Sequence, residues 1–192
     1  MAVDPTGRTG RTALTMEGTL IDASTGKRRK GVDGVTGEDF LTAGAFSRVG
    51  GYLAVADYQG RLTLWDARTW RRITVLRASG STLHRVALAF SADGSLLAAG
   101  APDGSVQVWE TASPALPPAT LPAGDVPVLA LGFTPGGGEL CVATPHLADR
   151  THPLAARRSA SAVCARAGGG LTETEWHRYF PSAVYRPTCD GT

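Results

Sequence analysis

The sequence has neither a marked excess of charge of one sign nor a long apolar run, and both absences narrow its possible functions. Its 192 residues include 19 lysines and arginines and 17 aspartates and glutamates, so the net charge is only +2. This balance gives no electrostatic reason to expect a nucleic-acid partner. No apolar run approaches the ~20 residues of a membrane-spanning helix, and the N-terminus lacks the features of a signal peptide. We therefore expect a cytoplasmic protein with no membrane partner.

Cysteine and histidine are scarce, and their positions argue against a metal site or a disulfide scaffold. The chain has three cysteines and four histidines. Three cysteines are too few for a disulfide framework. Cys141, His146 and His152 lack the close spacing typical of a zinc site, so we expect no metal. Cys164 and Cys189 would approach each other if the C-terminal tail folded back, but a cytosolic disulfide is not expected to persist. Whether they pair stays open.

The sequence also lacks the local motifs that carry catalysis or phosphate binding. His84 has no Gly-x-Ser-x-Gly turn near it, and glycines 136–138 are not followed by the Lys-Ser/Thr of a phosphate loop. The basic run 27–30 is interpreted as a solvated loop, with a phosphate- or nucleic-acid-binding patch as the alternative. We therefore expect no catalytic, cofactor-binding or metal-binding residues, and a protein that is not an enzyme.

What the sequence does contain is an internal repeat. Trp65-Asp66 recurs as Trp109-Glu110 after 44 residues, and Phe46 recurs as Phe90 at the same interval. Phe133 follows 43 residues after Phe90. A period in the low forties is typical of β-propellers, in which each repeat supplies one four-stranded blade. We expect both tryptophans to be packing residues.

The clearest repeat covers about residues 85–122. Apolar and small residues alternate from Val86 to Phe90, which predicts a half-buried strand, and the apolar run 96–99 predicts a strand buried on both faces. Asp103-Gly104 is a strong hairpin signal, because glycine and aspartate suit the positive φ angles of a type I′ turn. Residues 41–77 show the same pattern, so two complete blades are expected here.

Incomplete copies flank these two repeats. Ile21-Asp22 takes the place of the tryptophan–aspartate pair in an earlier copy, whose first strand would have to precede Met1. In the last copy, residues 149–151 are aligned with residues 103–105, and Pro153 is expected to interrupt the third strand. The sequence thus predicts a degenerate partial blade at 1–40 and blades at 41–152, the last one decayed.

A helical pattern replaces the β-pattern in residues 153–192. Small and apolar residues spaced at i, i+3, i+4 and i+7 over 160–167 predict one helix, ended by glycines 168–170. Thr172 and Glu175 form a capping box that predicts the start of a second helix. An extended tail should follow, so this region is expected to be a helix-loop-helix cap. The expected buried face of the second helix consists of Trp176, Tyr179 and Phe180.

These repeats resemble the WD40 family, chiefly through Phe90-Ser91, Asp103-Gly104, Trp65-Asp66 and Trp109-Glu110. The resemblance covers roughly residues 2–150 and implies an all-β fold. That fold is a partial WD40-like β-propeller of about three full blades plus one partial, with a short C-terminal helical appendix. The tail resembles the end of large bacterial WD40 proteins, in which the propeller commonly follows an ATPase, kinase or protease-like module. This implies a terminal segment or truncated relative of such a protein.

The sequence departs from the family pattern at the buried polar network of histidine, serine or threonine, aspartate and tryptophan. Repeats of this family often begin with Gly-His. Here Gly80-Ser81 and Gly124-Asp125 lie near those positions, and Gln59 replaces the turn aspartate of the first full repeat. Only Asp103 and Trp109 remain in plausible network positions. We therefore expect apolar packing and strand pairing to hold the blades together.

The resemblance implies a non-catalytic protein-interaction scaffold. The alternatives are a sensor segment that controls a signal-transduction ATPase or kinase module, and an enzyme. The expected partner is a protein or the rest of a longer propeller, and open blade edges predict self-association. Loops at one end of the blades would do the binding. The sequence does not show which of Arg48, Tyr58, Arg85 and their neighbours would contact a partner, so no binding residue is assigned.

Overall fold

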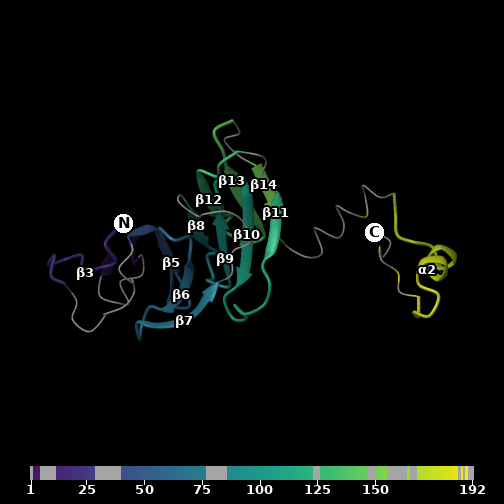
Figure 1. The fold of residues 1–192 in the computed structure, drawn as a ribbon. Helices are drawn as coiled ribbons and strands as arrows, with labels where there is room; N and C mark the ends of the chain where they lie inside the picture. The colour runs from purple at the N-terminus through teal and green to yellow at the C-terminus, as the bar shows by residue number, and fades with distance from the viewer. Residues whose placement is uncertain are drawn as a thin grey trace. The chain divides into compact units, whose positions relative to one another are not determined.

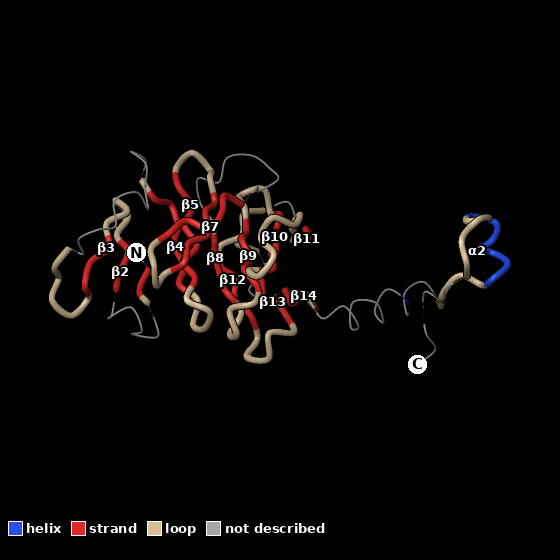
Figure 2. The backbone as a smooth tube through the Cα atoms, turned by 90° about the horizontal axis from the view of Figure 1, so that it is seen from below, coloured by secondary structure: helices blue, strands red, loops and turns tan. Residues whose placement is uncertain are grey.

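The computed structural model consists mainly of four consecutive β-sheets (Figures 1 and 2). The chain divides into two compact units, Met1–His152 and Pro153–Thr192. The structure describes residues 2–4, 12–28, 40–76, 86–122, 126–146, 150–154, 164, 168–185, 187 and 189.

Each sheet is a meander in which strands that follow one another in sequence pair with one another. The first sheet has three strands, β1 (Ala2–Val3), β2 (Thr12–Leu14) and β3 (Leu20–Asp22). The second has four, β4 (Leu41–Phe46), β5 (Tyr52–Asp57), β6 (Leu62–Asp66) and β7 (Arg71–Leu76). The third also has four, β8 (Ala87–Phe90), β9 (Leu96–Gly100), β10 (Ser105–Glu110) and β11 (Ala119–Pro122). The fourth has three, β12 (Ala130–Phe133), β13 (Glu139–Ala143) and β14 (Arg150–Pro153).

The first strands of the four sheets lie next to one another. Strand β1 packs against β4, β4 against β8, and β8 against β12. Adjacent first strands, with later strands progressively farther out, are the arrangement of blades in a propeller. The predicted all-β fold, a partial propeller with a short helical appendix, is confirmed.

The core lies between the faces of neighbouring sheets. In β5, Leu53 and Val55 belong to the cluster shared with the first sheet, while Ala54 and Ala56 belong to the cluster shared with the third. A strand covered on both faces needs a continuous apolar run, which explains the composition of both β5 and β9. Trp109 is buried among the residues of the second and third sheets, as expected for a packing residue.

Short polar turns join the strands. At Asp103-Gly104, the turn that joins β9 to β10, Gly104 has φ +82° and the Asp103 Oδ1 accepts a 2.9 Å hydrogen bond from the Ser105 amide, so the predicted hairpin is confirmed. In the turn between β8 and β9, Gly94 has φ +74°, and a Cβ on it would lie 2.1 Å from the Val49 carbonyl oxygen. The turns of the second and third sheets therefore touch where only glycine fits.

The first sheet differs from the sequence-based expectation. Its first strand does not precede Met1, because β1 pairs with β2 through Ala2–Leu14 and Val3–Ala13. A strand of two residues is too short to show an alternating pattern, so no periodicity predicts it. An isolated bridge between Ile21 and Arg28 continues the pairing beyond β3.

The expected alignment in the fourth sheet is wrong as well. Residues 150–153 form β14, so Pro153 ends the third strand instead of interrupting it. Proline is tolerated there because the last residue of an edge strand need not donate to the ladder. Cys141 Sγ and Thr151 Oγ1 lie 4.0 Å apart, so these two residues share a face of the sheet.

In the second unit, helix α2 (Glu173–Tyr179) begins at the predicted capping box. The Glu175 amide donates to Thr172 Oγ1 at 3.3 Å, and the Thr172 amide donates to Glu175 Oε2 at 2.9 Å. The helix predicted over 160–167 lies outside the described residues except for Cys164, which is helical. Gly168 has φ +73° and the Gly169 amide donates to the Cys164 carbonyl, which is the C-terminal glycine motif of a helix.

The expected buried face of α2 is wrong, because Tyr179 is 64% and Phe180 48% exposed. Trp176 packs instead against the chain that follows it. Its ring centroid lies 6.1 Å from that of Tyr185, and its Nε1 donates to the Ala183 carbonyl at 3.1 Å. The chain after α2 thus folds back and covers one side chain.

The fold-back also brings the two distant cysteines together. Cys164 and Cys189 form a disulfide, with their Cα atoms 5.6 Å apart. The sequence analysis left this pairing open and did not expect the bond to persist. The disulfide closes a loop of 25 residues, which removes conformational freedom from the unfolded segment.

The contact between the third and fourth sheets predicts the effect of a single methyl group. A Cβ on Gly100 would lie 2.4 Å from Val128 Cγ1, whereas one on Gly132 would meet no atom within 4 Å. Gly100→Ala should lower the free energy of unfolding by about 1–3 kcal/mol through overpacking. Gly132→Ala, the matched control, should leave it unchanged or slightly higher. Urea unfolding of both variants measures the change in the free energy of unfolding. An equal change in the two variants would contradict the close contact between Gly100 and Val128.

The turn at Asp93 predicts a dependence of stability on pH. Hydrogen bonds from the Ser91 hydroxyl first, and from the Ser95 amide and hydroxyl, lower the pKa of Asp93 from 3.8 to about 2. A lowered pKa stabilises the fold above the unfolded pKa, and this stability is lost as the pH falls through the folded value. Urea midpoints should therefore decrease between about pH 4 and pH 2. Asp93→Asn should show a smaller decrease than Glu110→Gln, an exposed control. If the urea midpoints of the two variants decrease equally with falling pH, Asp93 does not have this role.

Candidate functional site

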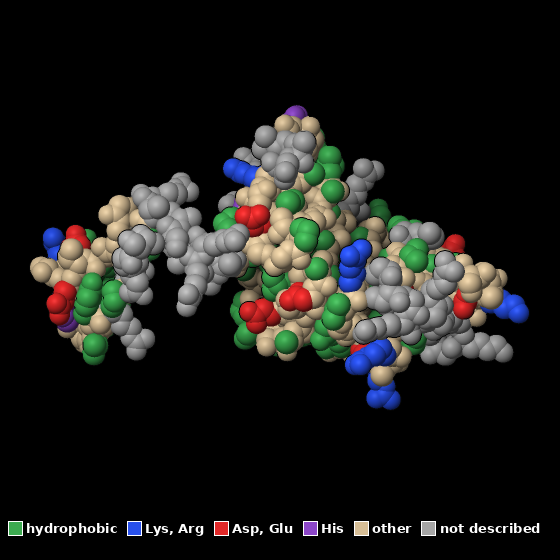
Figure 3. All heavy atoms as spheres, turned by 180° about the vertical axis from the view of Figure 1, so that it is seen from behind, with side chains coloured by type: hydrophobic (Ala, Val, Ile, Leu, Met, Phe, Trp, Pro, Cys, Tyr) green, Lys and Arg blue, Asp and Glu red, His purple; other side chains and the backbone are tan. Residues whose placement is uncertain are grey.

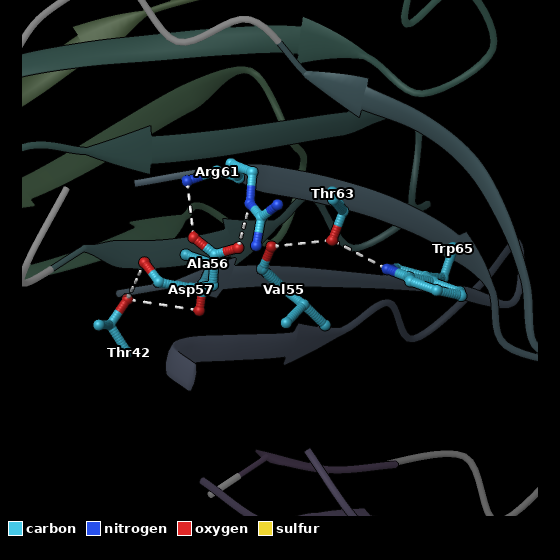
Figure 4. Close-up of polar contacts among 7 residues, drawn as sticks. All are labelled: Thr42, Val55, Ala56, Asp57, Arg61, Thr63 and Trp65. Atoms are coloured by element: carbon cyan, nitrogen blue, oxygen red, sulfur yellow. Dashed lines mark hydrogen bonds and ion pairs between the residues drawn. The ribbon is translucent and has the colours of Figure 1, made fainter. Parts of the chain in front are cut away.

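The tryptophan of the second sheet is the centre of a small polar network (Figure 4). Trp65 Nε1 donates to Thr63 Oγ1 at 2.9 Å, and that hydroxyl donates to the Val55 carbonyl at 3.2 Å. The indole is therefore buried with its single donor satisfied. The sequence analysis placed the remaining network at Asp103 and Trp109 and missed this one. The available signal was a threonine two residues before a tryptophan, which puts both on one face of a strand.

His152 lies on the face of the fourth sheet that corresponds to the tryptophan face of the second and third sheets. Trp65 lies opposite Leu53, and Trp109 lies opposite Leu97. Because Cys141 and Thr151 share one face of the fourth sheet, His152 lies on the other face, with Leu140. Among the described residues, its Nε2 is the buried side-chain polar atom without a hydrogen-bond partner.

The surroundings of His152 favour the neutral ring. Burial lowers the pKa of His152, and the positive charge of Arg150, two residues earlier, lowers it further. A histidine thus replaces a bulky packing residue and remains uncharged at neutral pH. Its place in the sheet gives it a packing role.

In the described part of the chain, the fourth sheet is more fully covered on one face than on the other. In β13, Leu140 and Val142 are fully buried, whereas Glu139, Cys141 and Ala143 between them are only half-buried. Four of the five residues of β9 are buried, on both faces of that strand. The less covered face continues onto β12 and β14, since Gly132 pairs with Cys141 and Ala130 with Ala143. We call this surface the open face; its small residues are Ala130, Gly132, Cys141, Ala143 and Thr151.

Two aromatic residues are exposed at the end of the second sheet where β4 begins. Phe40 is 67% and Tyr58 59% exposed, and the Tyr58 amide donates to the Phe40 carbonyl at 2.9 Å. We call these residues the rim pair. In the same hairpin, Arg61 Nε lies 2.6 Å from Asp57 Oδ2, and the Arg61 amide donates to Asp57 Oδ1 at 2.9 Å (Figure 4). Asp57 thus connects the two ends of this hairpin turn through both of its carboxylate oxygens.

The other sequence candidates are scattered. Arg48 lies in the turn after β4, at the opposite end of the second sheet from Tyr58, and both His84 and Arg85 lie outside the described residues. Residues 136–138 form the turn between β12 and β13, where Gly137 has φ +67°. In the basic run, Arg28 donates to Thr19 Oγ1 at 2.9 Å, and positions 29 and 30 lie outside the described residues.

The described residues bring no group of three or more histidine, cysteine or acidic side chains into a metal-binding arrangement. In the same part of the chain, no helix has the length and apolar character needed to cross a membrane. Apolar and charged side chains are interspersed over the visible surface of the larger unit (Figure 3). We consider the rim pair and the open face as surfaces for binding.

The network at Trp65 predicts how much stability is lost when the hydroxyl group of Thr63 is removed. Thr63→Val keeps the shape of the side chain but leaves the buried indole N–H without its acceptor. The free energy of unfolding should fall by about 1–3 kcal/mol, the cost of an unsatisfied buried donor. Thr63→Ser, which keeps the hydroxyl, should retain most of the stability. Urea unfolding followed by tryptophan fluorescence measures both; a valine variant as stable as the serine variant would rule the network out as a stabilising element.

Comparison with known proteins agrees with this architecture. Residues 70–110 match the family model described as WD domain, G-beta repeat. The match begins just before β7 and ends with β10, so one sequence repeat joins the outer strand of one sheet to three strands of the next. A search of curated proteins found no match. The chain therefore contains a WD40 repeat at residues 70–110, and its four stacked sheets agree with a partial WD40-like propeller.

Proposed function

We propose that this chain is a non-catalytic scaffold that binds a protein partner through the rim pair. WD40 repeats in general mediate protein–protein interaction, and WD40 domains are in general scaffolds rather than catalysts. The single observation that carries the proposal is the exposure of two neighbouring aromatic side chains, Phe40 and Tyr58, at one end of a rigid sheet.

The chemistry of the rim pair suits a protein interface. Aromatic side chains bury a large apolar area on binding and lose little conformational freedom, so they are enriched where interfaces gain most of their affinity. The ion pair of Asp57 with Arg61 lies beside them, and polar groups around an apolar centre are typical of such interfaces. The partner is therefore expected to present an apolar pocket with polar groups at its margin.

We further propose that the chain forms the end of a larger regulatory protein in the cytoplasm. The resemblance of its tail to the ends of large bacterial WD40 proteins supports the regulatory context.

Replacing Tyr58 tests the proposed binding surface. Tyr58→Glu should weaken binding of the partner roughly tenfold or more, because a charge replaces an apolar contact residue. Tyr179→Glu is a matched control, since Tyr179 is 64% exposed but lies on α2 in the second unit. Candidate partners would be crosslinked, identified by quantitative mass spectrometry, purified and measured by calorimetry.

The outcome depends on the difference between the two variants. A partner that binds wild type and Tyr179→Glu equally, but loses affinity for Tyr58→Glu, supports the rim pair. Equal affinity of all three proteins, each with the same circular dichroism spectrum, would refute it.

A further inference from the structure

We propose that the outer edge of strand β7 binds an extended, acidic peptide segment of another protein, which adds to the second sheet as a further strand. In this mode of recognition, main-chain hydrogen bonds provide the affinity, and the side chains along the edge provide the specificity. The edge is a different surface from the rim pair, so the inference does not depend on the function proposed above.

Strand β7 is the longest of the four outer strands, with six residues. Among the described strands it pairs with β6 alone, so a row of its main-chain groups is directed away from the sheet. Four of its six side chains are exposed, and two of these are apolar: Ile73 is 45% and Val75 46% exposed. An exposed edge strand with apolar side chains is a template for pairing with another chain.

The outer strands of the other sheets have features that disfavour such pairing. Strand β3 has three residues, and Arg28 forms a bridge to it at Ile21. Strand β11 has four residues and ends in Pro122, and β14 has four residues and ends in Pro153. A short edge offers few main-chain partners, and proline has no amide hydrogen to donate. Strand β7 contains no proline, so its edge is the best suited of the four to accept a strand.

The side chains of β7 divide its edge into a basic half and an apolar half. Arg71 and Arg72 come first, and both are exposed. Residues 74–76 follow in regular register with residues 62–64 of β6, and Val75 is the exposed side chain among them. Side chains directly opposite each other on neighbouring strands interact. A bound strand should therefore carry an apolar residue beside Val75 and acidic residues beside the two arginines.

The basic half has an excess of positive charge. Arg68, in the turn before β7, lies 3.6 Å from Asp66, and its side chain is 73% exposed. The segment 62–76 contains three arginines and one aspartate, so its formal charge is +2. A strand that extends an antiparallel meander runs opposite to β7, so its C-terminal end lies beside the arginines. The expected ligand is therefore a segment in which acidic residues follow alternating apolar residues.

A bulge in β7 favours a short peptide over the same edge of a second copy. The pairing with β6 shifts register between Leu64 and Trp65, which leaves Ile73 as the extra residue of the bulge. A bulge bends its strand and increases the local twist. A flexible peptide can follow this twist as it binds. In contrast, β7 of a second copy has the same bulge, and it brings two more arginines and no acidic side chain.

Fluorescence anisotropy with a synthetic peptide tests the edge. The acidic probe is a fluorescein-labelled peptide with blocked ends and the sequence Thr-Val-Thr-Val-Thr-Asp-Glu. The full chain is titrated into it up to about 300 µM, and the Kd should lie below about 100 µM. The basic probe is identical except that it ends in Lys-Lys, and it should bind at least tenfold more weakly, because it meets the arginines with like charge.

Two N-methylated versions of the acidic probe distinguish strand addition from simple adhesion of side chains. Every second amide is methylated in each version, and the two sets alternate. A strand that adds to an edge directs one set of amides toward β7 and the other toward solvent. One version should therefore lose affinity at least tenfold, whereas the other should keep most of it.

Charge reversal locates the contact on the protein. Arg72→Glu should weaken binding of the acidic probe at least tenfold, and it should bind the basic probe more tightly than wild type does. Arg178→Glu makes the same change at an exposed arginine of α2 in the second unit, so it should bind both probes like wild type. Circular dichroism of each variant checks that it is folded.

The titrations of wild type decide the proposal even if Arg72→Glu fails to fold. Absence of binding at about 300 µM chain overturns it, as does equal affinity for the acidic and basic probes. An equal effect of the two methylation patterns overturns strand addition. Analytical ultracentrifugation tests the remaining occupant: a chain that dimerises and releases the acidic probe as it does so would assign the edge to a second copy and overturn the peptide.

Discussion

The packing of one sheet face against the next is the interaction on which the rest of the larger unit depends. Small residues on one sheet accept large apolar side chains from its neighbour, and β5 takes part in two such contacts, one on each face. This packing explains why the second strands are apolar throughout and why the first strands lie side by side. Among the described residues, the open face of the fourth sheet has such small residues without a sheet packed on them.

The polar interactions of this unit act over short distances. The Asp57–Arg61 pair and the hydrogen bonds of Asp93 and Asp103 each stay within a single turn. Even the network of Trp65 lies within the second sheet. These interactions determine the conformation of hairpins, while apolar packing determines how sheets associate. The rim pair combines the two, since a polar hairpin holds exposed aromatic groups at the end of an apolar stack.

The second unit is stabilised differently. It has one described helix of seven residues with no buried residue, too short to be stable alone. A capping box, the contacts of Trp176 with the chain after the helix, and the disulfide between Cys164 and Cys189 hold it together. Local hydrogen bonds and a covalent link thus substitute for an apolar core.

The sequence by itself determined the features that depend on neighbouring residues. The repeat period, the hairpin at Asp103-Gly104 and the capping box at Thr172 are all local patterns, and each is present in the structure. Only the tertiary structure decided the position of β1, the face of the fourth sheet on which His152 lies, and the exposure of Tyr179. A two-residue strand has no readable period, and strand register and burial depend on residues distant in the sequence. For the same reason the open face could not be predicted: its residues resemble those of the buried interfaces, and only the absence of a covering sheet distinguishes them.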